Sequence, residues 1–396
     1  MDFSLGDDIR MTREMVRRFV RDDLIPLEPL VIRRESERGM SDDPILPKDV
    51  EDKLQARARE LGLWGIDAPE EFGGQNLGAL MKCVVVEEMK QSIVPLVLPP
   101  DSPNLYYLKQ QCTPDQARRY LDPYVKGEKK SCLALSEPGA GSDAGAIEMR
   151  AVQRDGKWVL NGQKLWISNA RRADFMIVIA VTDPAKRARG GMTAFLVDKG
   201  TPGVSIPSSY PMIGEYHPYG VNFDDVELGE EQVLGEVGQA FVPLSNRLGI
   251  RRMEIAARSL GLAARAIDMM IEQAKTRRTF GAALADRQTA QNWISDSWQE
   301  LEMARLITYR LAWRIDSGET DVRREAAMAK VQATEMATRV VDRAIQLHGG
   351  MGLSKELPLE YMSRILRVYR IVEGPSEVHR WTIARDLLKS GQPEAA

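Results

Sequence analysis

The chain contains few of the residues that mark disulfide-rich proteins. Its 396 residues include three cysteines. They are Cys83, Cys112 and Cys132. Their odd number and the lack of a CxxC pair argue against a disulfide framework and favour a reducing, cytoplasmic compartment.

Histidine is equally scarce. The three histidines, His217, His348 and His379, are too far apart in sequence to indicate a metal site, and we expect none. His379 falls within a predicted helix, and we expect it on the helix surface. A GxSxG motif, which would indicate a serine hydrolase, is also missing.

Long apolar runs and basic blocks are lacking too. No run approaches the ~20 apolar residues that a membrane helix requires, and the longest, 175–181, predicts a buried strand. The first eight residues lack the basic and apolar regions of a signal peptide. The net charge is −3 and no long basic segment occurs. We therefore expect a protein that binds neither nucleic acid nor a membrane.

What the chain does have is a polar, glycine-rich segment. Residues 135–143 read LSEPGAGSD. Gly139 and Gly141 let a ligand approach the main chain, and Ser136 and Ser142 offer hydroxyl donors. The segment is neither a GxGxxG dinucleotide fingerprint nor a Walker loop. Taken alone, a segment of this composition is more often a surface turn.

The first third of the chain predicts helices. Apolar residues recur at helical spacing over 9–24, 47–62, 81–93 and 115–124. Pro26 should end the first of these helices. Because no strand signal precedes Ser131, we predict an N-terminal helical domain over residues 1–129.

The middle of the chain predicts a β domain over residues 130–235. Asn161-Gly162 lies between two strand-like runs and predicts a hairpin turn. Short runs rich in β-branched residues predict further strands over 175–181, 192–197, 203–206 and 220–228. No helices are predicted between them, which favours an antiparallel sheet or barrel over a βαβ array.

The last part, residues 236–396, predicts an antiparallel four-helix bundle. Helical periodicity covers 252–276, 286–315, 321–347, 359–367 and 375–388. We expect Asp321 to cap the third of these helices and Gly349-Gly350 to end it. The fold class is thus mainly α with a β insert.

In this order of parts, the chain resembles the acyl-CoA dehydrogenase flavoprotein family. The segments that carry the resemblance are PEEFGG at 69–74, LSEPGAGSD at 135–143, WIS at 166–168, RRTFG at 277–281 followed by Gln288, QLHGGMG at 346–352, and EG at 373–374 followed by Arg380. Each is a weak signal alone, but six in the family's order make chance a poor explanation.

The resemblance implies an FAD cofactor bound without a Rossmann unit. The residues carried over as flavin contacts are Leu135, Ser136, Gly141, Ser142, Trp166, Ile167, Ser168 and Ser376. Those carried over as contacts to the diphosphate and adenosine, some of them across a dimer interface, are Arg277, Thr279, Phe280, Gln288, Gln346 and Gly350. The arginine suits this role because its guanidinium offers a fork of donors to phosphate oxygens.

The resemblance also implies α,β-dehydrogenation of an acyl-CoA, with electrons passed to electron-transferring flavoprotein. Removing a weakly acidic α-proton requires a carboxylate base and hydrogen bonds to the developing enolate. Glu373 is the candidate base, in a partly desolvated pocket after two apolar residues. Ser142, Arg252 and Gly374 are the candidate substrate contacts. The family implies a dimer of dimers.

Some residues depart from the family pattern. Val372 replaces a tyrosine before the base, Pro375 replaces a threonine after it, and Gly249 replaces the aspartate of Asp-x-x-Arg. These departures resemble the branch that includes enzymes acting on 4-hydroxyacyl-CoAs, although Glu373 differs from the aspartate common there. A flavin-dependent oxidase or monooxygenase, and a catalytically inert flavin-binding scaffold protein, are the alternative functions.

Overall fold

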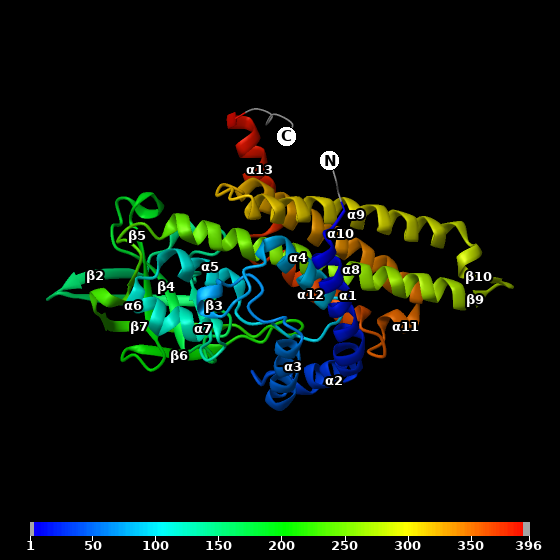
Figure 1. Ribbon diagram of the computed structural model, residues 1–396, viewed down its shortest axis with the longest axis horizontal. Coiled ribbons are helices and arrows are strands. Elements are labelled where there is room, and N and C mark those ends of the chain that lie inside the picture. Colours follow the sequence, from blue (N-terminus) through cyan, green and yellow to red (C-terminus); the bar gives the residue numbers. More distant parts are fainter. Residues whose placement is uncertain (1–3, 391–396) are drawn as a thin grey trace.

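The computed structural model describes residues 4–390, and Figure 1 shows three parts along one long axis. The β-sheet part lies at one end, and a bundle of long helices extends from it to the opposite end. The helices of residues 7–89 pack along the middle of these long helices. Residues 1–3, part of the segment searched for a signal peptide, and residues 391–396 lie outside the described range.

The N-terminal part is helical, as predicted. Its α-helices are α1 (Asp7–Phe19), α2 (Glu28–Arg38), α3 (Lys48–Glu60), α4 (Gly78–Met89), α5 (Ser102–Gln111), α6 (Pro114–Gln116) and α7 (Asp122–Val125). The prediction that Pro26 ends the first helix is wrong. The chain passes through a π turn (Val20–Leu24) and a 3₁₀ turn (Ile25–Leu27) directly into α2. Pro26 lies in the first residues of the 3₁₀ turn, where a missing N–H costs no helical hydrogen bond.

The middle part is an eight-stranded sheet. Its strands are β1 (Ser131–Ala134), β2 (Arg150–Arg154), β3 (Lys157–Ile167), β4 (Phe175–Val181), β5 (Met192–Asp198), β6 (Val204–Ser209), β7 (Tyr219–Leu228) and β8 (Val233–Leu234). The order is β6-β7-β3-β2-β4-β5-β8, with β1 beside β4. Most pairs are antiparallel, as predicted, but β1 and β2 both run parallel to β4. The path of strands is open and forms no closed barrel.

The predicted hairpin at Asn161-Gly162 is wrong. β3 continues through both residues, and a bulge follows Leu160 in its pairing with β7. Gly162 is needed there because a Cβ would lie 2.8 Å from the Met149 side chain. The turn instead falls at Asp155-Gly156, whose φ angles of 48° and 75° suit a two-residue hairpin.

The C-terminal part consists of long helices, as predicted. Its elements are α8 (Phe241–Thr276), β9 (Arg278–Thr279), β10 (Ala282–Ala283), α9 (Gln288–Asp316), α10 (Arg323–His348), α11 (Gly350–Leu353), α12 (Leu359–Tyr369) and α13 (Ser376–Ser390). The predicted cap at Asp321 is wrong, because α10 begins at Arg323 and no side chain caps it. A different aspartate, Asp316, accepts the backbone N–H groups of Ala79 and Leu80 at the start of α4.

Three apolar cores hold the parts together. One is shared by α1 to α4 with α8, α9, α10 and α12. The second lies between one face of the sheet and α5, and the third covers the other sheet face. α5 therefore lies between the sheet and the long helices. Among the described helices, none has the length and apolar character that crossing a membrane requires.

Candidate active site

The glycine-rich segment forms an open turn directly after β1. Glu137 and Ala140 exchange two backbone hydrogen bonds of 3.0 and 3.1 Å, which close the turn. A Cβ added at Gly139 or Gly141 would meet no atom within 4 Å. The outer side of this turn is therefore open to a ligand. Ser142, which follows Gly141, is exposed as well.

A buried ion pair fixes this turn to β3. Lys164 Nζ lies 2.8 Å from the Glu137 carboxylate and also donates to the Leu135 carbonyl at 2.9 Å. Glu137 accepts the backbone N–H groups of Glu148 and Met149 as well. Burial lowers the pKa of Lys164 to about 8, against the opposing effect of Glu137. Both side chains were missed at the sequence level, since an isolated Glu or Lys gives no signal of burial.

The predicted flavin contacts on β3 lie beside this turn. The backbone N–H of Leu165 donates to the Ser136 carbonyl at 2.8 Å. Trp166 has a φ of 63° and is 47% exposed, and its ring lies 4.9 Å from that of Tyr210. A non-glycine residue in the left-handed region is strained, and such strain is frequent at ligand sites. Leu135, Ser136 and Trp166 are thus brought together by the fold, with Ile167 buried and Ser168 exposed next to them.

Glu373 occupies a tight turn between α12 and α13. Its φ is 57° and that of Gly374 is 95°. Its carboxylate oxygens lie 3.2 and 3.4 Å from Nη1 of Arg247, on α8. The side chain is 21% exposed. Arg252, one turn further along α8, donates from Nε to the Glu373 carbonyl at 3.1 Å.

Two further side chains contact the backbone carbonyls of this turn. Lys330 on α10 donates to the Gly374 carbonyl at 2.6 Å, and His379 Nε2 lies 3.1 Å from the Glu373 carbonyl. His379 is 1% exposed, so the expectation that it lies on a helix surface is wrong. Burial, with help from Arg252 and Lys330, lowers the pKa of His379 to about 3. It is therefore neutral near pH 7 and donates to Glu373 when the proton is on Nε2.

The charge on Lys330 provides a first testable prediction. Burial, with Arg252 adding to the effect, lowers the pKa of Lys330 to about 7 from 10.5, while Glu373, Glu335 and Glu377 oppose this. Between about pH 7 and pH 10 the unfolded chain then binds more protons at this position than the folded chain. Wild type should therefore gain stability relative to Lys330→Met as pH rises through this window. Urea unfolding across the window measures this, and a difference that is independent of pH would contradict it.

Asn104 on α5 connects Glu373 to the sheet. It accepts from Nε of Arg247 at 3.1 Å, and its amide donates to Ser131, the first residue of β1, at 2.9 Å. The polar contacts therefore run from Glu373 through Arg247 and Asn104 to the strand that leads into the glycine-rich turn. Neither Arg247 nor Asn104 was predicted as a site residue.

The other predicted cofactor contacts lie far from Glu373 in the same chain. Arg277 follows α8, Thr279 and Phe280 belong to the β9–β10 hairpin, and Gln288 begins α9. Roughly 36 Å of helix separates Arg252 from the end of α8. Figure 1 places this hairpin at the end opposite the sheet. Phe280 is 100% exposed with a φ of 51°.

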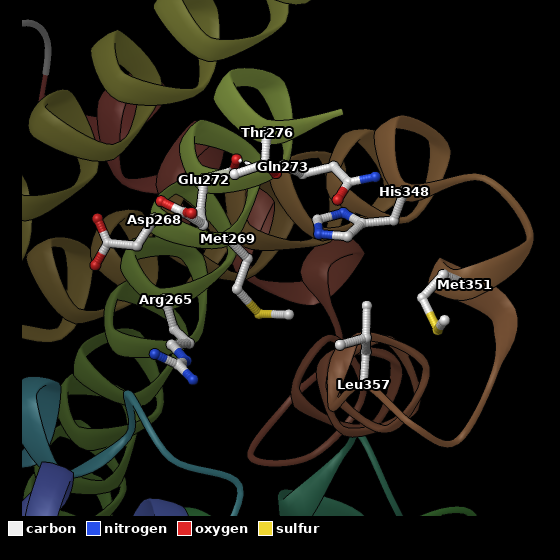
Figure 2. A pocket seen from close by; sticks show the side chains of 9 residues that line it. All are labelled: Arg265, Asp268, Met269, Glu272, Gln273, Thr276, His348, Met351 and Leu357. Carbon is white, nitrogen blue, oxygen red and sulfur yellow. Dashed lines mark hydrogen bonds between the residues drawn. The ribbon is translucent and has the colours of Figure 1, made fainter. Parts of the chain in front are cut away.

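Gln346 and Gly350 lie at this distant end too. A cavity of about 520 Å³ lies between the C-terminal ends of α8 and α10, and Figure 2 shows the side chains that line it. Thr276 lines it from α8, and His348 and Met351 line it from the end of α10 and from α11. None of the predicted site residues lines the cavity itself. Ser376, by contrast, is buried at the start of α13, beside the Glu373 turn.

Comparison with known proteins identifies the chain. Family models match all three parts: the acyl-CoA dehydrogenase N-terminal domain over residues 6–128, the middle domain over 132–226 and the C-terminal domain over 242–388. The chain belongs to the acyl-CoA dehydrogenase family. It is therefore an oxidoreductase, and FAD is its cofactor.

Individual relatives cover nearly the whole acyl-CoA dehydrogenase chain. It is 48% identical to (R)-benzylsuccinyl-CoA dehydrogenase of Thauera aromatica, over 99% of this chain and 98% of the relative. Butyryl-CoA dehydrogenase from Megasphaera elsdenii has a TM-score of 0.88 at 31% identity, covering 98% of this chain and all of the other. PigA, solved with FAD and proline, has a TM-score of 0.88 at 28% identity, covering 99% and 100%.

The residues present fit FAD in two separate places. The open turn at 139–141 and the exposed, strained Trp166 offer backbone and aromatic surface to a planar ring. Arg277 and the fully exposed Phe280 offer a cation and an aromatic ring at the far end. One chain keeps these two places apart, so the two sets cannot both touch one cofactor within a single subunit.

Proposed function

We propose that this acyl-CoA dehydrogenase family member removes the α-proton and the β-hydrogen of an acyl-CoA, with Glu373 as the base. The observation that carries the proposal is the Glu373 turn. Three buried or partly buried polar side chains from α8, α10 and α13 hold a strained carboxylate-bearing turn beside the sheet. Strain that so many contacts maintain is typical of a functional position.

Glu373 would act through two of its groups. Its carboxylate takes the proton from Cα as the double bond to Cβ forms. Among the hydrogen bonds of residues 4–390, none uses the Glu373 backbone N–H as a donor. It is therefore free to donate to the thioester oxygen, on which negative charge develops. The chemistry that FAD supplies when bound is acceptance of the β-hydrogen with its electron pair.

The substrate and the electron acceptor complete the proposal. The 48% identical relative makes (R)-benzylsuccinyl-CoA a candidate substrate, and family resemblance makes electron-transferring flavoprotein the candidate acceptor. An anaerobic absorbance titration tests the first part. The protein carrying FAD should be bleached by one class among straight-chain, branched, 4-hydroxylated and benzylsuccinyl thioesters. If none of them bleaches the flavin, the proposed reaction is wrong.

We also propose that the distant cofactor contacts serve a neighbouring subunit. A two-fold dimer would bring Arg277 and Phe280 of one subunit against the open turn of the other, which removes the conflict between the two places. Phe280, which is exposed in the single chain, would then be buried in the dimer. The dimer-of-dimers arrangement extends this proposal by family resemblance.

A substitution in the β9–β10 hairpin tests this arrangement. Arg277→Ala should weaken FAD binding about 10-fold or more, because a hydrogen bond to a charged phosphate is lost. Arg278→Ala is the matched control, since Arg278 donates to Gly281 within its own hairpin. FAD affinity follows from flavin fluorescence during dilution. Equal affinity in the two variants would contradict a cofactor role for this hairpin.

A further inference from the structure

Two arginines of α8 differ in how their charges are compensated. Arg251 donates to both oxygens of Asp101 at 2.6 and 2.7 Å and to Glu254 at 2.7 Å. Arg247, one turn earlier, has a side chain that is 6% exposed. Within the described chain its only carboxylate partner is Glu373. The base itself therefore neutralises a buried guanidinium.

The ion pair between Arg247 and Glu373 opposes the proposed role of Glu373 as the base. Both carboxylate oxygens of Glu373 lie at Nη1 of Arg247, and the carboxylate must leave this contact to reach a proton on Cα. Once Glu373 has left that contact, Arg247 keeps no ion pair of its own, because Asp101, the other carboxylate close enough to act on it, is already paired with Arg251. Burial makes such an uncompensated charge costly. A second carboxylate delivered with the substrate would remove both difficulties.

The surroundings of Arg247 fix the direction of its guanidinium. Nε donates to Asn104, which is 2% exposed and held in turn by Ser131. Nη1 faces Glu373, while Nη2 makes no hydrogen bond to any residue among 4–390. A planar fork with one free nitrogen beside a displaceable carboxylate is suited to bidentate binding of another carboxylate.

We propose that Arg247 binds a carboxylate carried by the acyl group of the substrate, and that this carboxylate replaces Glu373 as the partner of Arg247. The inference rests on the proposed function, since it assumes that Glu373 faces Cα. Nη1 lies within 3.4 Å of both Glu373 oxygens. The substrate carboxylate must then lie within a few bonds of Cα. The preferred substrates are mono-CoA thioesters of dicarboxylic acids.

Two thioesters that differ in one group test the proposal. The first is (R)-benzylsuccinyl-CoA, and the second is the same thioester with its carboxylate replaced by a carboxamide. The carboxylate thioester should reduce the flavin of the wild-type enzyme with a second-order rate constant roughly 100-fold larger than that of the carboxamide thioester. This ratio is the size expected for the loss of a buried charge pair. A ratio near one in the wild type overturns the proposal without any variant.

Variants then assign the preference to Arg247. Arg247→Gln should lower the carboxylate rate roughly 100-fold and bring the ratio close to one, whereas Arg247→Lys should retain part of the preference. Arg252→Gln is the matched control: it loses the contact to the Glu373 carbonyl and should lower both rates by the same factor. Binding of each thioester to the oxidised enzyme, followed by the flavin spectral shift, should show the same selectivity.

The outcomes separate this inference from the proposed function. If Arg247→Gln lowers both rates equally, Arg247 only positions Glu373 and the carboxylate site is wrong. If neutral acyl-CoAs bleach the flavin and dicarboxylic thioesters do not, the carboxylate site is again wrong, while the proposed dehydrogenation stands. If no acyl-CoA bleaches the flavin, both are wrong.

Discussion

Glu373→Gln should slow flavin reduction by acyl-CoA by roughly 10³- to 10⁴-fold, because the amide cannot accept the α-proton. The contacts that hold the turn should survive. Arg252 and His379 approach the Glu373 backbone carbonyl, and Lys330 approaches that of Gly374. Bound FAD and the affinity for an acyl-CoA without a second carboxylate should therefore change little. Rapid mixing without oxygen, followed by flavin absorbance, measures the reduction rate directly.

A neighbouring carboxylate provides the control for this result. Glu377 is exposed in the first turn of α13, four residues beyond Glu373. Glu377→Gln should retain the wild-type reduction rate. The loss of a general base should slow flavin reduction by more than about 10-fold. If the reduction rate of Glu373→Gln lies within about 10-fold of the wild-type rate, another group removes the proton.

Glu137→Gln should lower the free energy of unfolding by about 3 kcal/mol, because the buried Lys164 must then either stay charged without its carboxylate or give up its proton. The side chains of the pair are 7% and 0% exposed, so solvent cannot replace the lost partner. The same substitution should weaken FAD binding, since Lys164 and Glu137 fix the turn at 135–141 to β3. Urea unfolding and FAD titration measure the two effects.

Glu148→Gln is the matched control for this substitution. Glu148 is exposed near the same strand, and its backbone N–H rather than its carboxylate contacts Glu137. It should change stability by less than about 0.5 kcal/mol. If Glu137→Gln is equally mild, the buried pair contributes little to the turn.

The sequence predicted the long, strongly periodic elements and failed where distant contacts decide local structure. The fully buried strand Phe175–Val181 was predicted to the residue, because a short β-branched run has few other solutions. Asn161-Gly162 looked like a hairpin turn, but packing of Gly162 against Met149 places it within a strand. Pro26 looked like a helix end, but it lies within a 3₁₀ turn through which the chain continues into α2.

Site residues were predictable only where a motif names them. LSEPGAGSD and Glu373 were found by family resemblance, and the fold places the first beside Trp166. Arg247, Asn104 and Lys330 carry no local signal. Their positions depend on contacts between α8, α5, α10 and the Glu373 turn, which are far apart in sequence. His379 was assigned to the surface because helical periodicity alone does not show what covers a helix.

The central claim is that Glu373 takes a proton from Cα as the flavin is reduced. Single-turnover reduction with a bleaching thioester, deuterated or not at Cα, tests it most directly. The flavin of the wild type should be bleached more slowly by the deuterated thioester than by the undeuterated one. The flavin of Glu373→Gln should be bleached far more slowly than that of the wild type by both thioesters. Equal rates with both thioesters in wild type, together with rapid bleaching of Glu373→Gln, would contradict the account.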